Sequence, residues 1–203
     1  MREKIFVGVT SFVLIALLLV AYFKGEPGFL INNLVPEFIG VCIEFIIIVL
    51  AFNLWQKKEE KDNNIKVERR LREFLIFFLK NNFQDFPLSC QPGRFYGKDH
   101  TNNQKCLNDL IAHIESNGLT EGFKSGVQTY CNNEKEIFNN LIPVASQITN
   151  NHFKSWVRIA YFMNSISFES KSKGIDHDVI KILQHIKEFD NASFQSNLYV
   201  GAV

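Results

Sequence analysis

The chain has 203 residues, of which 46% are apolar and 21% are charged, and its formal net charge at pH 7 is +1. A net charge this close to zero argues against a protein that wraps nucleic acid as a whole, because such proteins carry a strongly basic face. The average hides two compositions, since residues 1–55 hold seven charged side chains and the remaining 148 residues hold 36. This contrast excludes a single water-soluble globule from the expected fold classes. It predicts an all-α membrane protein in which an N-terminal two-helix transmembrane hairpin precedes a mostly helical cytosolic domain.

The first predicted element is a membrane-spanning helix over about residues 5–23, a run of 19 residues without a charge. At about 1.5 Å per residue, a helix of this length nearly crosses a hydrocarbon layer of about 30 Å. A cleaved signal peptide is the alternative, because Arg2 and Lys4 precede the run. The run is longer than the usual apolar core of such peptides, however, and no small-x-small cleavage site follows it.

A second predicted span covers about residues 35–55, so the hairpin as a whole occupies residues 1–56. Pro36 suits the first turn of a helix, and Trp55 suits the membrane interface. Residues 24–33 connect the two spans and contain two glycines and a proline, which turn the chain without providing a folded external domain.

Basic residues at both ends of the hairpin predict its orientation. Arg2 and Lys4 precede the first span, and Lys57, Lys58 and Lys61 follow the second. By the positive-inside rule, both termini should be cytoplasmic, and the protein should be a multi-pass membrane protein with two spans. The lysines that follow the second span either attract anionic lipids or belong to a solvated helix.

The second predicted span contains two acidic residues, and these are the candidate functional residues within the membrane. Glu37, Gly40 and Glu44 fall on one helical stripe, with the glycine allowing close approach of another helix. An ionised carboxylate at the depth of Glu44 costs several kcal/mol unless it has a partner. Two interpretations remain: a protonated or hydrogen-bonded acid that holds helices together, or a carboxylate that faces water in an assembled pore.

The sequence after the hairpin predicts a folded helical domain. Residues 57–83 form a charged and amphipathic juxtamembrane helix, residues 84–104 form a loop or hinge, and residues 105–203 form helices that pack with residues 65–83. The run FLIFFL at residues 74–79 is apolar on every side and predicts burial. Further helices are expected from about residue 102 to an Asn117-Gly118 stop, and over residues 120–130, 133–148, 153–168 and 176–189, with Pro143 kinking or starting a helix and with no confident strand.

No motif in this sequence indicates catalysis or a cofactor, and we expect a non-enzymatic protein without a bound cofactor or metal. The glycines form no phosphate-binding loop. Cys90, His100, Cys106 and His113 have spacings that match no usual zinc site, although a Cys-His nucleophile pair stays open. The four cysteines fit no disulfide framework and are expected to be reduced thiols. The phenylalanines follow helical core spacing, so we predict no direct sequence-specific binding of nucleic acid.

The layout as a whole resembles a family of bacterial defence proteins. The second span NLVPEFIGVCIEFIIIVLAFNLW, the charged exit QKKEEKDN and the helical domain that follows are similar to the two-transmembrane effectors of retron-type antiphage systems. The resemblance covers mainly residues 1–75. It implies a toxic inner-membrane protein that is held silent by a reverse transcriptase and its RNA-linked DNA and is released on infection.

The leading hypothesis is therefore a membrane-embedded effector of antiviral defence that disrupts the inner membrane when a cytosolic partner activates it. Its expected partners are the lipid bilayer, further copies of itself and, by resemblance, the reverse transcriptase with its RNA-linked DNA. The alternative is a membrane-anchored scaffold or sensor domain without pore activity. A membrane-tethered enzyme of an unrecognised kind is a third hypothesis.

Overall fold

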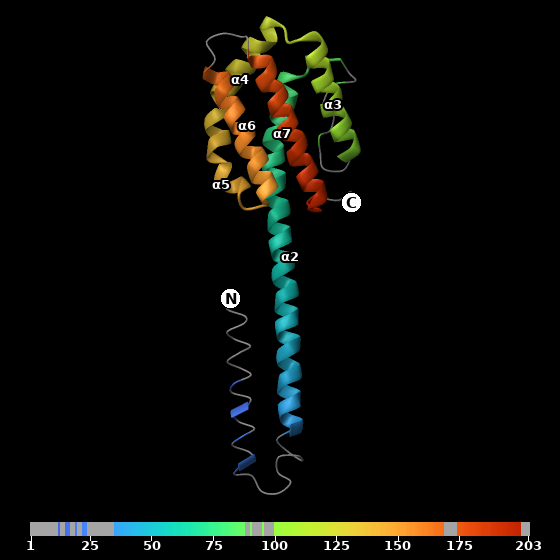
Figure 1. Cartoon of the computed structure of the whole chain (residues 1–203), viewed down its shortest axis with the longest axis vertical. Coiled ribbons are helices and arrows are strands. Elements are labelled where there is room, and N and C mark those ends of the chain that lie inside the picture. Colours follow the sequence, from blue (N-terminus) through green and yellow to red (C-terminus); the bar gives the residue numbers. More distant parts are fainter. Residues whose placement is uncertain are drawn as a thin grey trace. The chain divides into compact units, whose positions relative to one another are not determined.

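The computed structural model describes residues 12, 15–16, 19, 22–23, 35–87, 90, 95, 100–168 and 174–199. These residues form helices and connecting turns, with no strand among them, which confirms the predicted helical fold (Figure 1). The chain divides into two compact units, residues 1–58 and residues 59–203, and each unit is described by itself.

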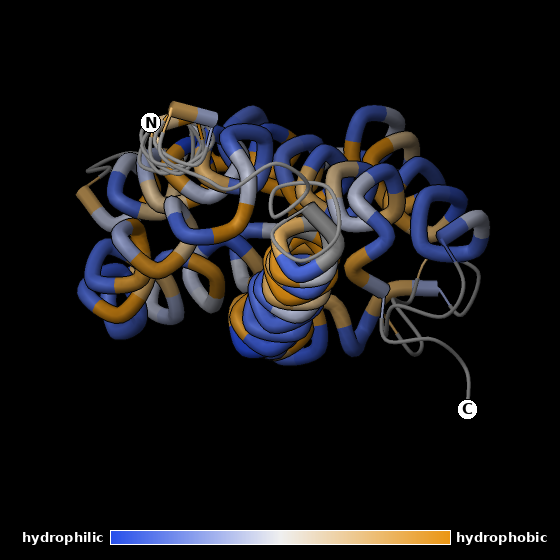
Figure 2. The backbone as a smooth tube through the Cα atoms, turned by 90° about the horizontal axis from the view of Figure 1, so that it is seen from below, coloured by the Kyte–Doolittle hydropathy of each residue, from blue (hydrophilic) through white to orange (hydrophobic). Residues whose placement is uncertain are grey.

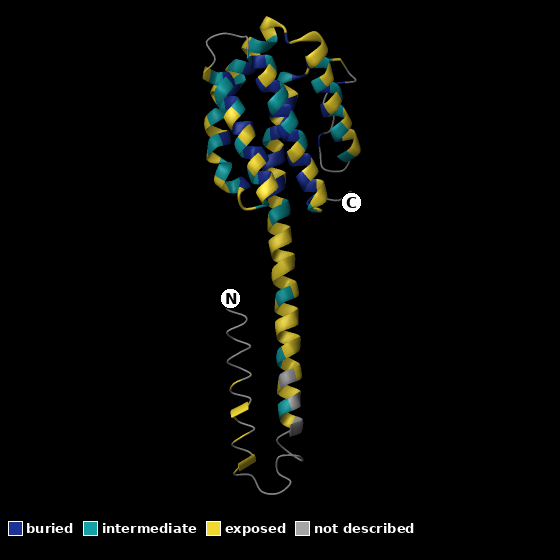
Figure 3. Ribbon diagram, viewed as in Figure 1, coloured by how far each residue is buried: buried dark blue, intermediate teal, exposed yellow. Residues whose placement is uncertain are grey.

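The N-terminal unit contains the beginning of helix α2, which runs from Val35 to Asn82. Within this unit most described large apolar side chains of α2 are exposed, whereas Phe38 and Phe45 are half-buried, and Figure 3 shows the exposed residues along this part of the helix. The exposed large apolar side chains are Val41, Ile43, Ile46, Ile47, Ile48, Val49, Leu50, Phe52, Leu54 and Trp55.

The predicted transmembrane hairpin of residues 1–56 is corrected by the structure. Among the residues it describes, no helix is long and apolar enough to cross a membrane. The helix that holds the predicted second span contains Glu37 and Glu44 and continues without a break through the charged sequence after Trp55. Most of the predicted first span, residues 5–23, lies outside the described residues. The predicted two-span location in the inner membrane loses its support with the hairpin.

The C-terminal unit is a bundle of helices that includes the last part of α2. The helices after α2 are α3 (His100–Asn117), α4 (Glu121–Asn140), α5 (Ile142–Ala145), α6 (Asn150–Phe168) and α7 (Ile175–Gln195). Within this unit α7 packs against both α6 and α3, and α6 also packs against α4 (Figure 1). Hydrophilic and hydrophobic residues alternate along these helices in Figure 2, as expected for amphipathic helices around one core.

Apolar side chains from every helix except the single-turn α5 supply the large members of this core. Four phenylalanines, Phe78, Phe83, Phe138 and Phe189, are almost completely buried, and Trp156 is buried among them. The prediction that the phenylalanines form a core is therefore correct for these residues. The run at residues 74–79 is not buried on every side, because Phe77 points outward and is 56% exposed.

Local sequence signals account for most helix ends. Helix α3 ends at the predicted Asn117-Gly118 stop, where Gly118 adopts a φ of +68° and its N–H bonds the Ile114 carbonyl at 2.8 Å. Helix α4 starts after Thr120, whose hydroxyl accepts the N–H of Phe123 at 3.3 Å. Pro143 lies in the first turn of α5, as predicted.

Two predicted helices are joined in the structure. Residues 120–130 and the start of the predicted helix at 133–148 form the single helix α4, which continues through Asn132 and Asn133 to Asn140. The helix continues because Val127, Cys131 and Phe138 keep one buried face across the asparagine pair. Helix α3 also begins at His100, slightly earlier than predicted, and the side chain of His100 bonds Asp190 on α7.

We predict that Trp156→Phe destabilises the protein by about 1–3 kcal/mol, because Trp156 is fully buried and stacks on Phe138 with ring centroids 5.1 Å apart. Its indole N–H also donates to the Phe138 carbonyl at 3.0 Å, and phenylalanine leaves that carbonyl without its donor. Urea unfolding of the full chain measures the loss. Tyr161→Phe, on the same helix at a residue that is 65% exposed, should stay within about 0.5 kcal/mol of the wild type. Equal midpoints for the two variants would contradict the prediction.

Candidate functional site

The sequence-predicted candidates on α2 lie on an exposed helix surface. Glu37, Gly40 and Glu44 are all exposed, and a Cβ added at Gly40 would meet no atom within 4 Å. The spacing places the three residues on one stripe of α2, as predicted, but no described residue bonds either carboxylate. The predicted role of Glu44 depended on its depth in a membrane span, and no described helix is long and apolar enough to form one.

The other residues that the sequence analysis considered do not form one site, although the Cys106 thiol donates to the Cys90 carbonyl at 3.6 Å. Lys57, Lys58 and Lys61 are exposed on α2. Of the four residues considered for zinc, His100 bonds Asp190 and His113 lies 3.3 Å from the Asn117 amide. No group of three or more potential metal ligands converges among the described residues.

A buried polar cluster at the centre of the helical unit was not predicted. Its centre is Asp190 on α7, which is 0% exposed and pairs with Arg72 of α2 at 2.7 Å. Arg72 also pairs with Glu68 one turn earlier at 2.7 Å. The guanidinium lies over the rings of Phe95 and Tyr199, 5.2 and 5.0 Å from their centroids, which adds cation–π stabilisation in a desolvated position.

Donors from three segments converge on the Asp190 carboxylate. From α3, Asn103 donates to Oδ1 at 3.1 Å and Gln104 donates to Oδ2 at 3.0 Å. The Tyr199 hydroxyl, which follows α7, donates to Oδ1 at 2.6 Å. Burial by itself raises the pKa of Asp190, but Arg72 and these donors outweigh it and hold the pKa below its ordinary value. Asp190 is therefore a fixed anion that joins α2, α3 and α7.

A second branch of the cluster contains a serine and a histidine, and its bonding does not activate a nucleophile. Ser193 donates to Glu68 Oε1 at 2.7 Å, and His152 Nε2 lies 3.0 Å from the same serine oxygen. Because the serine proton is directed at Glu68, His152 donates from Nε2 and accepts the Thr149 hydroxyl proton at Nδ1, 2.7 Å away. Ser193, His152 and Glu68 are at most 2% exposed, so a substrate has no access to them.

The sequence contained a signal for this cluster that was missed. Glu68 and Arg72 fall in phase with Leu75 and Leu79 at steps of four, three and four residues, so they lie on the apolar stripe of α2. A charged pair on such a stripe indicates a buried ion pair, not a solvated face.

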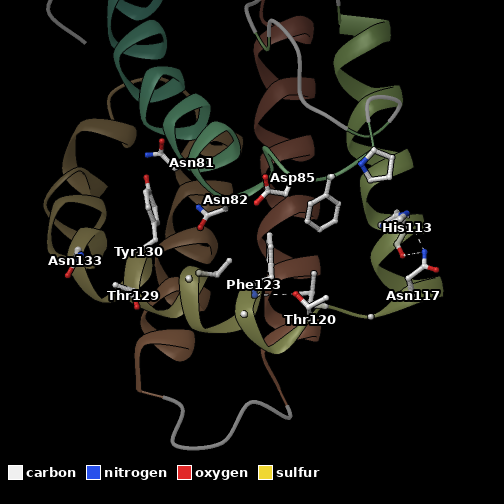
Figure 4. Close-up of a pocket in the computed structure, with 17 residues that line it drawn as sticks. Asn81, Asn82, Asp85, His113, Asn117, Thr120, Phe123, Thr129, Tyr130 and Asn133 are labelled. Atoms are coloured by element: carbon white, nitrogen blue, oxygen red, sulfur yellow. Dashed lines mark hydrogen bonds between the residues drawn. The ribbon is translucent and has the colours of Figure 1, made fainter.

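The site best suited to an external ligand is an open cleft of about 830 Å³ in the helical unit (Figure 4). Such a volume lies within the usual range of ligand sites, about 300–1,000 Å³. The end of α2 and the turn after it form one side of the cleft, and the end of α3 with the first three turns of α4 forms the other. We call this site the α2–α4 cleft.

The polar groups of the α2–α4 cleft are mostly amides and hydroxyls. Asn81, Asn82, Asn117 and Asn133 line it together with Thr120, Thr129 and Tyr130, and Asp85 and His113 are the titratable side chains beside them. No lysine or arginine occurs among the described lining residues. The cleft therefore offers both hydrogen-bond donors and acceptors without a strong positive charge.

Several of these groups have unused hydrogen-bonding capacity. The side chains of Asn81 and Asn133 make no hydrogen bond with a described residue, and Figure 4 shows Asn81 beside Tyr130. Burial and, to a smaller degree, the carboxylate of Glu134 raise the pKa of Tyr130, so its hydroxyl stays protonated and can donate. The rings of Phe86 and Phe123 pack 5.1 Å apart and give the cleft an apolar part.

Glycines form part of the α4 wall. Gly122 and Gly126 are one turn apart on α4, and a Cβ added at either would meet no atom within 4 Å. A glycine inside a helix is about 0.8–1.0 kcal/mol less favourable than alanine. Packing within the unit therefore does not require these glycines, although they weaken the helix that carries them.

Comparisons with known protein families, curated proteins and solved structures find no match for this chain. The resemblance to retron effectors and its implied partners therefore rest on the quoted residues alone.

We predict strong coupling between Arg72 and Asp190. Arg72→Met leaves Glu68 and Asp190 buried without their cation, and Asp190→Asn leaves the cation with one carboxylate, so each change should cost about 3–5 kcal/mol. The double variant should be less destabilised than the sum by at least about 1 kcal/mol, because the second change removes a charge that the first left unpaired. Urea unfolding of the four proteins measures the cycle, and additivity within about 0.5 kcal/mol would contradict coupling.

We also predict that His152 makes stability depend on pH. Burial, assisted by the positive charge of Arg72, lowers the pKa of His152 to about 4. In the unfolded chain this histidine is protonated near pH 6.5, whereas in the folded chain it stays neutral down to about pH 4. Protonation therefore favours the unfolded chain, and the free energy of unfolding falls as the pH falls from about 6.5 to 4. The loss is about 3 kcal/mol, and His152→Gln should abolish it whatever its effect at pH 7.

The control for this measurement is His177→Gln, at a histidine whose side chain is 67% exposed. Urea unfolding between pH 7 and 4 should give the control and the wild type the same slope. A His152→Gln variant with the wild-type slope would show that another group carries the dependence.

Proposed function

We propose that residues 59–203 form a partner-binding domain without catalytic chemistry of its own, and that the chain is an effector of antiphage defence controlled through this domain. The observation that carries the proposal is the α2–α4 cleft, where amide and hydroxyl groups remain available to a ligand. Ser193 and His152, whose side-chain types often act in nucleophilic chemistry, lie instead inside the buried cluster with Glu68, and the described lining of the cleft contains no serine or cysteine beside Asp85 and His113.

The charge of the cleft favours a protein partner over nucleic acid. Phosphate backbones are bound mainly through lysine and arginine, and none occurs among the described residues that line the cleft. The defence role comes from the resemblance of residues 1–75 to retron effectors. Of the partners it implies, the reverse transcriptase protein fits this chemistry better than the RNA-linked DNA. Disruption of a membrane is not part of the proposal, because it depended on the transmembrane hairpin.

We predict that phage protection in the native host requires both the chain and its cleft. Deleting the gene from its locus should raise the plating efficiency of a susceptible phage at least about tenfold. Complementation with the wild type should restore protection, and the double variant Asn81→Ala, Asn133→Ala should not, because it removes amides that are free to bind a partner.

Asn132→Ala is the matched control, since Asn132 is exposed on the same helix and lies outside the cleft lining. At equal protein amounts it should protect as the wild type does. Unchanged plating after deletion of the gene would contradict the defence role. Full protection by the double variant would contradict the role of the cleft.

A further inference from the structure

We infer that the α2–α4 cleft binds an extended peptide segment of a partner protein that lacks acidic side chains, and that it reads the main chain of this segment through asparagine side chains. This inference rests on the proposed function, because it names the class of ligand that the partner-binding domain takes. Its basis is the combination of size, hydrogen-bonding groups, charge and glycine placement in one cleft.

The dimensions of the cleft suit a short extended segment. The lining residues of α4 extend from Gly122 to Asn133, which is about 16 Å along the helix axis. An extended peptide advances about 3.3 Å per residue, so the α4 wall matches about five residues. Asn117 and Asn133 lie toward opposite sides of the cleft in Figure 4, which places an amide near each end of such a segment.

The polar groups match a peptide main chain. An asparagine side chain offers both an N–H donor and a carbonyl acceptor, and an extended main chain presents the same two groups alternately. Asn81 and Asn133 have both functions unused among the described residues, and the Tyr130 hydroxyl adds a donor. The ring pair of Phe86 and Phe123 gives an apolar side chain of the ligand a surface for packing.

The charge of the lining and the position of the glycines further restrict the class of ligand that the cleft can bind. Without a described lysine or arginine in the lining, the cleft has no counter-charge for phosphates or for acidic side chains. At Gly122 and Gly126 the backbone of α4 is uncovered, which lets a peptide main chain approach more closely than a Cβ would allow. Since packing does not require glycine at either position, ligand access is a physical reason for both.

The test selects ligands from a phage-displayed library of random dodecapeptides on the purified full chain. Enriched peptides, synthesised with a fluorophore, should lack acidic side chains and should bind the wild type by fluorescence anisotropy. The double variant Gly122→Gln, Gly126→Gln should bind them at least about tenfold more weakly while its Tm is equal to or above that of the wild type, because glutamine favours helix and extends into the cleft. Ser125→Gln places the same side chain outside the lining on α4 and should bind as the wild type does.

Three outcomes would overturn the inference: no enrichment of peptides, equal binding by the wild type and the glycine variant, or displacement of the bound peptide by a twelve-nucleotide oligo-dT. The last outcome would assign the cleft to single-stranded nucleic acid. If the glycine variant does not fold, Asn81→Ala, Asn133→Ala decides in its place, and it should weaken binding at least about fivefold. Specific peptide binding combined with unchanged phage plating would overturn only the defence role, so the two proposals fail separately.

Discussion

The helical unit depends on one buried carboxylate. Asp190 is inaccessible to solvent and remains ionised only because Arg72 pairs with it and residues of α3 and the C-terminal segment donate hydrogen bonds to it. Apolar burial is not directional and tolerates small shifts of one helix along another, whereas a charged hydrogen bond of 2.7 Å does not. We infer that the core supplies most of the stability of the unit and the cluster fixes the register of α2, α3 and α7.

The buried ion pairs of Arg72 lie in a different part of the unit from the candidate ligand site. Arg72 pairs with Glu68 and Asp190, and Glu68 accepts the proton of Ser193 beside His152, so the reactive side chains of this cluster are bound to one another. The α2–α4 cleft begins at Asn81, nine residues or about 14 Å further along α2. Apart from Asp85 and His113, its polar groups are amides, hydroxyls and uncovered helix backbone, which bind ligands but seldom react with them. A domain arranged in this way recognises a partner more readily than it transforms a substrate.

Sequence reasoning worked where a local cause determines the structure. The Asn117-Gly118 stop, the role of Pro143 and the burial of Phe78 follow from φ preference, the missing proline N–H and helical periodicity. Sequence reasoning failed where a prediction rested on apolar composition alone. The apolar run of residues 35–55 predicted a membrane span, but in the structure it is part of a much longer helix that carries charged residues. The candidates Glu37, Gly40 and Glu44 were selected on that prediction.

The sequence by itself determined that the protein is helical, where several of its helices end and that phenylalanines contribute to the core, because these properties depend on neighbours within about four residues. The spacing of Glu68 and Arg72 indicates a buried pair, but only the tertiary structure identified Asp190 as the second counter-charge of Arg72, because Asp190 lies 118 residues further along the chain. The cleft could not be predicted from the sequence either, because Asn81 and Asn133 come from helices that meet only after folding. Hydrogen bonds between distant segments leave no periodic signal, and a ligand site assembled from such segments leaves none either.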